Sequence, residues 1–275
     1  MSGWFPNPAG TTERRVATGR LMMNILEAGR GPTVLLIHGL GWDHSLWNPT
    51  IERFAPRYRT IASDTRGHGA TDKPEGPYDM EMFAHDYAAL ADVLGITRQC
   101  VVGLSQGGMI AQKLAVMRPD LVSALVLVST SCKSDPSLRT NMEARIAAME
   151  KAGPEAAAAI AAESIFSPSW RSANPQALQK FIAWRGSMPT APLNAATRAL
   201  YDFNLSGDLP RIAVPTLVVA GSEDVLTRPK GMEEIAALIP GAKYYLIPGA
   251  GHMIPVEQPV PLAALLDTFL KTHVG

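Results

Sequence analysis

Hydrophobic positions in this chain form short runs that alternate with longer stretches of helical period. The run at 33–37 (TVLLI) is apolar throughout, which is typical of a strand that is buried on both faces of a sheet. Similar runs predict five further strands, at 58–63, 100–104, 121–128, 214–220 and 242–247. Helical patterns separate or follow these runs, at 82–94, 108–117, 229–238 and 261–270. The alternation predicts an α/β fold with a mostly parallel sheet that is covered by helices on both faces.

Two segments depart from this alternation. The segment 13–27 is more polar, and we expect it to form an antiparallel hairpin at the sheet edge that turns near Gly19, which makes an eight-stranded sheet. The segment 133–207 contains only helical patterns and loop signals, and six prolines punctuate it. We therefore expect one α/β core, formed by residues 1–132 and 208–275, and an all-helical insertion at 133–207 after the sixth strand.

Composition narrows the class of protein. With 47% hydrophobic and 18% charged residues the chain is typical of soluble globular proteins. Its 25 basic and 25 acidic residues balance, which argues against nucleic acid or an anionic membrane as the main partner. No apolar run approaches the roughly 20 residues of a membrane span, and the N-terminus has no secretory pattern. Cys100 and Cys132 are predicted to be buried free thiols, so we expect a cytoplasmic protein. A small molecule is the expected partner, and a homodimer is left open.

The strongest chemical signal is the segment GLSQGG at 103–108. It directly follows a predicted strand and opens a predicted helix, and Ser105 has a glycine two positions away on each side. Small neighbours are needed where a strand turns sharply into a helix, and such a turn exposes the serine hydroxyl at the helix N-terminus. The spacing therefore predicts that Ser105 is a nucleophile.

A serine nucleophile needs a base, and the base needs an acceptor that orients it. His252 lies in a glycine-rich loop after the last predicted strand, where ligands bind in open parallel sheets. Asp224 follows the strand at 214–220, which gives the order serine, aspartate, histidine. We predict His252 as the base and Asp224 as its orienting acid, with Glu223 and Asp135 as alternatives for the acid.

Attack by a serine also creates an oxyanion, which needs backbone N–H donors. The N–H of Gln106 lies next to the nucleophile, at the start of the helix. The loop after the strand at 33–37 reads His38-Gly39-Leu40-Gly41, and its glycines allow it to turn back over Ser105. We predict the N–H groups of Leu40 and Gln106 as the two donors and interpret His38 as structural.

Taken together, these segments resemble the α/β-hydrolase superfamily. The matching segments are HGLG (38–41), DTRGHG (64–69), GLSQGG (103–108), GSED (221–224) and GAGH (249–252). The DTRGHGAT turn and the helix that begins GLSQGGMIAQKLA look most like the 3-oxoadipate enol-lactonase branch and its esterase and cofactor-free haloperoxidase-like relatives. Gln106 departs from that branch, which often has Met there. The resemblance implies the α/β-hydrolase fold, with 133–207 as its helical cap.

We therefore expect a serine hydrolase that cleaves a carboxylic ester or lactone through an acyl-enzyme on Ser105. Carbon–carbon bond hydrolysis and cofactor-free perhydrolysis by the same residues are alternatives, and so is a ligand receptor with slow turnover. No metal-ligand spacing or dinucleotide fingerprint occurs, so no metal and no cofactor is expected.

Apolar side chains of the insertion are expected to line a pocket over Ser105 or to form the insertion's own core. The candidates for substrate binding are Phe166, Trp170, Trp184 and Met188. Arg185 stands beside Trp184, and we interpret it as a solvated surface group; contact with a substrate carboxylate is the alternative.

Overall fold

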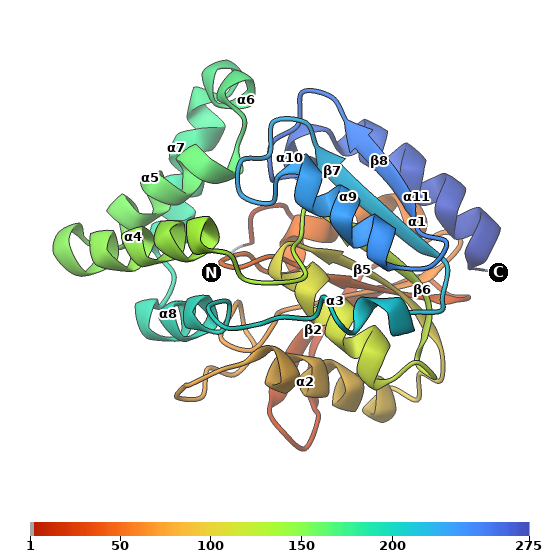
Figure 1. Cartoon of the computed structure of the whole chain (residues 1–275). Helices are drawn as coiled ribbons and strands as arrows, with labels where there is room; N and C mark the ends of the chain where they lie inside the picture. Colours follow the sequence, from red (N-terminus) through yellow and green to blue (C-terminus); the bar gives the residue numbers. More distant parts are fainter. Residues whose placement is uncertain (1–2, 275) are drawn as a thin grey trace.

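The computed structural model describes residues 3–274, except for the side chain of Leu138 (Figure 1). Eight strands form one sheet in the order β1-β2-β4-β3-β5-β6-β7-β8. Their bounds are β1 (Thr12–Ala17), β2 (Met22–Ala28), β3 (Thr33–Ile37), β4 (Arg59–Ser63), β5 (Gln99–Leu104), β6 (Val122–Val128), β7 (Thr216–Gly221) and β8 (Lys243–Ile247). β1 and β2 run antiparallel at one edge, and the strands from β4 to β8 run parallel. The predicted fold class is confirmed, including the edge hairpin.

The apolar runs become the inner strands because both of their faces are covered. Every residue of β3 and β5 is buried, whereas β8, at the edge of the sheet, is partly exposed. β3 pairs with β5 so that Ile37 lies opposite Gly103. The carboxyl ends of parallel strands therefore meet at one edge of the sheet, and the loops after β3, β5, β7 and β8 leave from that edge.

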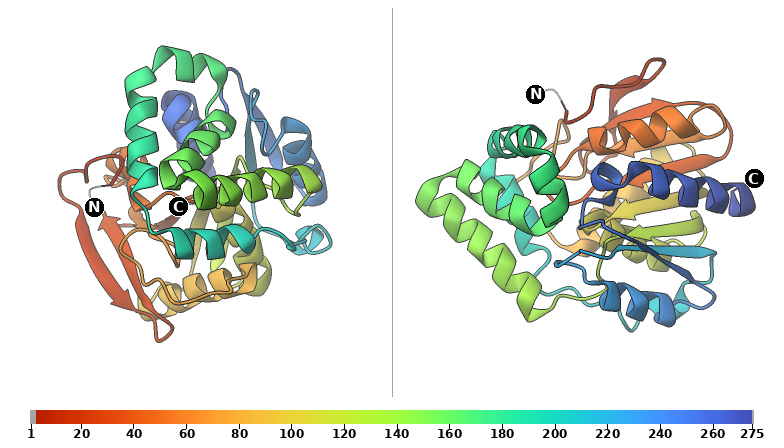
Figure 2. Two further views of the ribbon diagram at one scale, coloured as in Figure 1. Left: turned by 90° about the vertical axis from the view of Figure 1, so that its left-hand side faces the viewer. Right: turned by 90° about the horizontal axis from the view of Figure 1, so that it is seen from above.

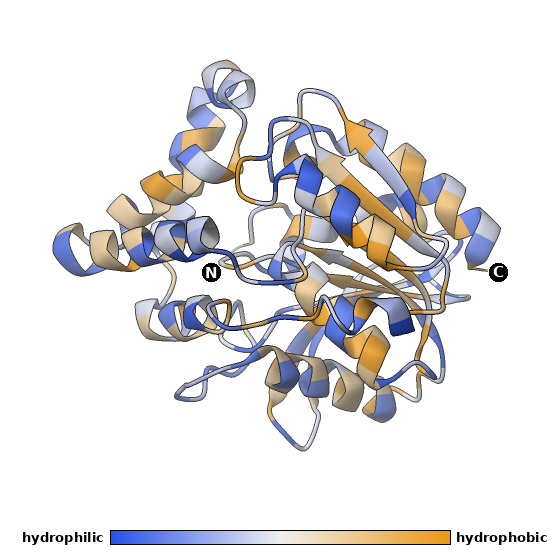
Figure 3. Cartoon of the chain, in the orientation of Figure 1, coloured by the Kyte–Doolittle hydropathy of each residue, from blue (hydrophilic) through white to orange (hydrophobic). Residues whose placement is uncertain are grey.

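Helices cover the two faces of the sheet (Figure 2). One face packs against α2 (Met80–Val93), α3 (Gln106–Met117) and α9 (Pro229–Leu238). The other packs against α1 (Asn48–Phe54) and α11 (Pro259–His273). Three short elements complete the core: η1 (His44–Trp47), η2 (Leu209–Arg211) and α10 (Ile254–Glu257). Figure 3 shows hydrophobic residues along the strands and both kinds of residue on the helices, as expected for helices with one buried face.

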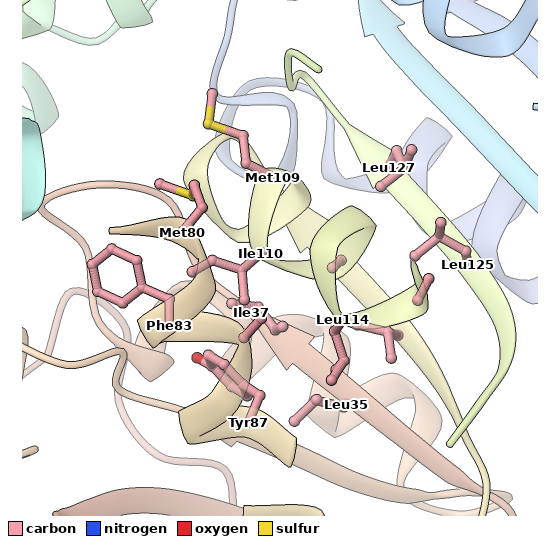
Figure 4. Packing of buried hydrophobic residues seen from close by; sticks show 14 of the residues in the cluster. Leu35, Ile37, Met80, Phe83, Tyr87, Met109, Ile110, Leu114, Leu125 and Leu127 are labelled. Atoms are coloured by element: carbon pink, nitrogen blue, oxygen red, sulfur yellow. The ribbon is translucent and has the colours of Figure 1, made fainter. Parts of the chain in front are cut away.

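Alternate residues of β3 face the two helical layers. Leu35 and Ile37 pack on the side of α2 and α3, where Figure 4 shows them among Tyr87, Ile110 and Leu114. These five side chains are buried. The α3 helix, whose first residue follows Ser105, is thus fixed to the central strands by its apolar face.

Five α-helices lie between β6 and β7, in the segment predicted as an insertion. They are α4 (Pro136–Ala152), α5 (Pro154–Ile165), α6 (Pro168–Ala173), α7 (Pro175–Gly186) and α8 (Thr190–Arg198). Four of them begin at a proline. The N–H groups in the first turn of a helix have no acceptor within the helix, so proline, which has no N–H, loses no hydrogen bond there. The helices gather at one side of the molecule (Figure 1), and an antiparallel bridge between Lys133 and Asn204 joins the two ends of the segment. Within residues 3–274, no helix is both long and apolar enough to cross a bilayer.

The packing of α3 on the sheet gives a stability prediction. Leu114 is fully buried, so Leu114→Ala removes apolar contacts and leaves a cavity; we expect a loss of about 2–5 kcal/mol in the free energy of unfolding. Val93, on α2, is 53% exposed, and Val93→Ala should change that free energy by only about 0.5 kcal/mol or less. Urea denaturation of the two variants measures both values. Equal losses would contradict the packing described here.

Candidate active site

Ser105 connects β5 to α3 in a strained backbone conformation, with φ 53° and ψ −118°. Its N–H donates to the Val128 carbonyl at 3.0 Å, and its own carbonyl accepts from the N–H of Gly108 at 2.9 Å. A Cβ atom on Gly103 would collide with the carbonyl of Gly107. The glycines therefore permit the tight turn that the sequence predicts, and the turn holds Ser105 at the N-terminus of α3.

His252 and Asp224 meet at the same edge of the sheet. His252 Nδ1 lies 2.9 Å from Asp224 Oδ2, and both side chains are buried. Asp224 Oδ1 accepts the N–H groups of Leu226 and Thr227, each at 2.9 Å. Burial alone would raise the pKa of Asp224, but the adjacent His252 and the hydrogen bonds from the hydroxyl and the N–H of Thr227 outweigh it and lower the pKa below its usual value. Asp224 is therefore a carboxylate that can orient the imidazole.

The two alternatives for the acid lie elsewhere. Glu223 is exposed. Asp135 accepts the N–H of Ser137 at 2.7 Å, at the start of α4. Of the three acidic residues considered, Asp224 is the one that contacts His252.

The loop that carries His252 is bonded to the helical insertion. The N–H groups of His252 and Met253 both donate to the carbonyl of Ile165, at 3.0 and 3.1 Å. Glu257 Oε2 accepts the N–H of Gly251 from the core and that of Ser167 from the insertion, each at 3.0 Å. Glu257 is not among the site residues that the sequence predicts. The one sequence feature that could have pointed to Glu257 is its position close after the loop of His252, at the end of the short α10.

The predicted oxyanion donors lie next to Ser105. A Cβ atom on Gly39 would be only 3.2 Å from the Cβ of Ser105, so the loop after β3 passes directly over the serine. Among residues 3–274, the N–H groups of Leu40 and Gln106 have no hydrogen-bond acceptor. Two free donors beside a serine are suited to an oxyanion. His38 is structural, as expected, because its Nε2 accepts the N–H of Thr65 at 2.9 Å.

Ser105 and His252 line one cavity, together with Leu40 and residues of the insertion. No hydrogen bond joins these two side chains, and the Nδ1 atom of His252 lies within hydrogen-bond distance of Asp224 and Thr227. The cavity has a volume of about 20 Å³, room for roughly one water molecule. A substrate of several carbon atoms therefore requires the lining side chains or the insertion to move outward.

Comparison with known proteins adds to this geometry. The model of the Alpha/beta hydrolase family matches residues 34–265. The chain belongs to this family.

Relatives of this α/β hydrolase include hydrolases that span nearly its whole length. It is 28% identical over 240 residues to 3-oxoadipate enol-lactonase 2 of Acinetobacter baylyi. The aligned region covers 87% of this chain and 89% of that protein. The malate-bound structure of a thermophilic esterase from Thermogutta terrifontis is 27% identical, with a TM-score of 0.88, over 96% of this chain and 100% of the other. The structure of the enol-lactonase of Burkholderia xenovorans LB400 is 26% identical, with a TM-score of 0.86, over 94% of this chain and 100% of the other. The predicted resemblance to the enol-lactonase branch is thus confirmed.

The candidate substrate-binding side chains lie outside the cavity at Ser105 of this α/β hydrolase. Phe166 and Trp170 stack on each other, with ring centroids 4.3 Å apart. Trp184 packs against Trp42, with ring centroids 5.2 Å apart. Trp184 and Met188 line a separate cavity of about 510 Å³ beside the N-terminal segment. Phe166, Trp170 and Trp184 instead pack against other aromatic side chains of the insertion and the core, which was the alternative expectation.

Two arginines of the insertion line the cavity at Ser105, beside the apolar Met142, Ile165 and Leu200 of the same insertion. Arg145 on α4 and Arg185 on α7 are buried, and both line the cavity at Ser105. The interpretation of Arg185 as a solvated surface group was wrong. Its Nη1 donates to the carbonyls of Leu40 and Gly41, at 2.9 and 2.7 Å, which keeps the guanidinium inside the protein.

Gly107, in the turn that follows Ser105, gives a prediction about folding. A Cβ atom on Gly107 would collide with the carbonyl oxygen of Ile37 and lie 2.6 Å from that of His38. Because backbone atoms cannot give way cheaply, we expect Gly107→Ala to lower the Tm by several degrees or to prevent folding. Gly231 in α9 has no atom within 4 Å of such a Cβ, so Gly231→Ala should leave the Tm unchanged or raise it. Differential scanning calorimetry compares the two, and equal melting temperatures would refute the crowding argument.

Proposed function

We propose that this protein is a serine hydrolase that cleaves a carboxylic ester or a lactone through an acyl-enzyme on Ser105. The observation that carries the proposal is the strained turn at Ser105 beside the His252–Asp224 pair, with all three groups at one edge of the sheet. An enol-lactonase and an esterase among the relatives support ester chemistry. Ser105 at the elbow, in place of an aspartate, favours acyl transfer over alkyl-enzyme chemistry.

The first half of the proposed reaction forms the acyl-enzyme. His252 takes the proton from Ser105 Oγ as that oxygen attacks the carbonyl carbon of the substrate. The N–H groups of Leu40 and Gln106 stabilise the resulting oxyanion. The carbon–oxygen bond to the alcohol then breaks, and the imidazolium returns its proton to the departing oxygen. In a lactone that alcohol stays attached to the acyl group.

The second half releases the acid. A water molecule replaces the alcohol, and His252 takes its proton as the water oxygen attacks the acyl carbon. The same N–H groups stabilise the second oxyanion, and the bond to Ser105 Oγ breaks as the proton passes back to that oxygen. Asp224 orients the imidazole and stabilises its charged form in both halves, which its low pKa suits.

Removal of the nucleophile is the first test. Ser105→Ala should lower kcat for p-nitrophenyl butyrate on the order of 10⁴-fold or more, because the remaining residues cannot form the covalent intermediate. Ser172→Ala, at an exposed position on α6, is the matched control and should leave kcat unchanged. A burst of p-nitrophenol in stopped-flow records would report the acyl-enzyme. Retention of a tenth of the wild-type rate in Ser105→Ala would exclude this serine as the nucleophile.

The acid is tested by a neighbouring pair of substitutions. Asp224→Asn keeps the size of the side chain but favours the wrong tautomer of His252, so kcat should fall on the order of 10³–10⁴-fold. Glu223→Gln changes an exposed carboxyl and should cost less than about tenfold, since Asp224 still holds the imidazole. Steady-state kinetics on p-nitrophenyl butyrate gives both factors. The opposite ranking would move the role to Glu223.

A further inference from the structure

Two arginines of the insertion lie buried beside the candidate nucleophile. Arg145 is 7% exposed and Arg185 6% exposed, and both line the cavity that contains Ser105 and His252. They come from different helices, α4 and α7, so the fold brings them together from positions 40 residues apart in sequence. Each lowers the free energy of an anion in this cavity.

Neither guanidinium has an acidic partner. Arg145 Nη2 donates to Ser164 Oγ at 2.7 Å, and its buried Nε has no hydrogen-bond partner. Arg185 uses Nη1 for two backbone carbonyls, while its Nη2 and Nε have no acceptor within residues 3–274. In the same part of the chain, no Asp or Glu oxygen lies within 4.0 Å of either group. The positive charge at this site is therefore not neutralised by the protein.

A third buried arginine shows how this chain neutralises such a charge elsewhere. Arg66 is 7% exposed, and its Nε and Nη2 donate to the two carboxylate oxygens of Asp86, both at 2.7 Å. A buried cation without such a partner is costly, because it has lost water and gained no opposite charge. The contrast with Arg66 indicates that Arg145 and Arg185 receive their counter-charge from outside the chain.

The two groups stay charged under ordinary conditions. Burial lowers the pKa of Arg145 to about 9, and the nearby Arg185 contributes to this shift. Burial also lowers the pKa of Arg185, to about 10. Both pKa values remain above neutral pH, so the cavity holds two cations that repel each other. An anion bound between them would remove that repulsion.

We propose that Arg145 and Arg185 bind a carboxylate of the substrate, so that the protein acts on esters or lactones that carry a negative charge. This inference rests on the proposed function for the reaction itself, but the binding site stands on its own geometry. The unused Nη2 and Nε of Arg185 present the planar pair of N–H groups that fits a carboxylate. Arg145 adds a second charge from α4. A neutral substrate would leave both charges unpaired.

Kinetics on matched esters test the substrate class. Mono-p-nitrophenyl succinate differs from p-nitrophenyl butyrate by a carboxylate in place of the terminal methyl group. We expect a higher kcat/KM for the succinate ester, and Arg145→Met should lower the ratio of the two kcat/KM values about tenfold or more, as loss of hydrogen bonds to a charged group does. Arg198→Met, at an exposed position on α8, removes the same net charge and should leave the ratio unchanged. Equal ratios in the wild type and all variants would overturn the inference.

Thermal shifts on Ser105→Ala test the binding site without any turnover. Monomethyl succinate at millimolar concentration should raise the Tm by about 2 °C or more, and dimethyl succinate should not. The shift should vanish when Arg145→Met is added. A shift with inorganic phosphate but none with monomethyl succinate would overturn the carboxylate assignment, and no shift with either would overturn the site.

The outcomes separate this inference from the proposed function. Anion-dependent shifts without Ser105-dependent hydrolysis of either ester would reject the proposed function and keep the site. Ser105-dependent hydrolysis with no preference for the anionic ester and no thermal shift would reject the anion-binding site and keep the proposed function. In Arg145→Met, Ser164 Oγ keeps its hydrogen bond to the carbonyl of Ala161, at 3.0 Å. Arg145→Met removes an unpaired buried charge, so its own Tm should be equal to or above that of the wild type.

Discussion

The close approach of α3 to the end of β3 is the constraint on which the site depends. Gly107 presses its backbone against the carbonyls of Ile37 and His38, so no side chain fits there. Two residues before this contact the chain turns at Ser105 with a positive φ, and the loop after β3 passes over the serine. The strain at Ser105 is stabilised by the buried face of α3, whose apolar side chains hold the helix on the central strands.

The rest of the site follows from the parallel sheet and from its bonds to the insertion. Asp224 and His252 follow β7 and β8, whose carboxyl ends point to the same edge as that of β5. The loop of His252 is hydrogen-bonded to Ile165, and the loop of Leu40 to Arg185, so the insertion contacts the proposed base and one of the proposed oxyanion donors directly. An outward movement of the insertion would change these hydrogen bonds.

The sequence predicts the parts of the molecule that local rules determine. Continuous apolar runs such as 33–37 and 100–104 belong to strands buried on both faces, and the glycines around Ser105 report backbone crowding. The positions of α1 and of the side chains of the insertion are not predictable in this way. Whether Trp184 or Arg185, adjacent on α7, faces the cavity at Ser105 depends on how five helices pack against the core, and neighbouring residues of a short helix give no local signal for it.

Electrostatics sets Arg145 and Arg185 apart from the mostly apolar side chains around them in the cavity at Ser105. Two buried cations that have no acidic partner raise the free energy of the folded protein. The chain pairs Arg66 with Asp86 where the charge is structural, but it provides no acid for Arg145 or Arg185. Under the proposed assignment, an anionic substrate supplies the missing charge, and α4 and α7 gain a shared contact over Ser105 only when it is bound. The same carboxylate would fix Arg185 against the carbonyls of Leu40 and Gly41, so that recognition of charge and positioning of the oxyanion donor act through one side chain.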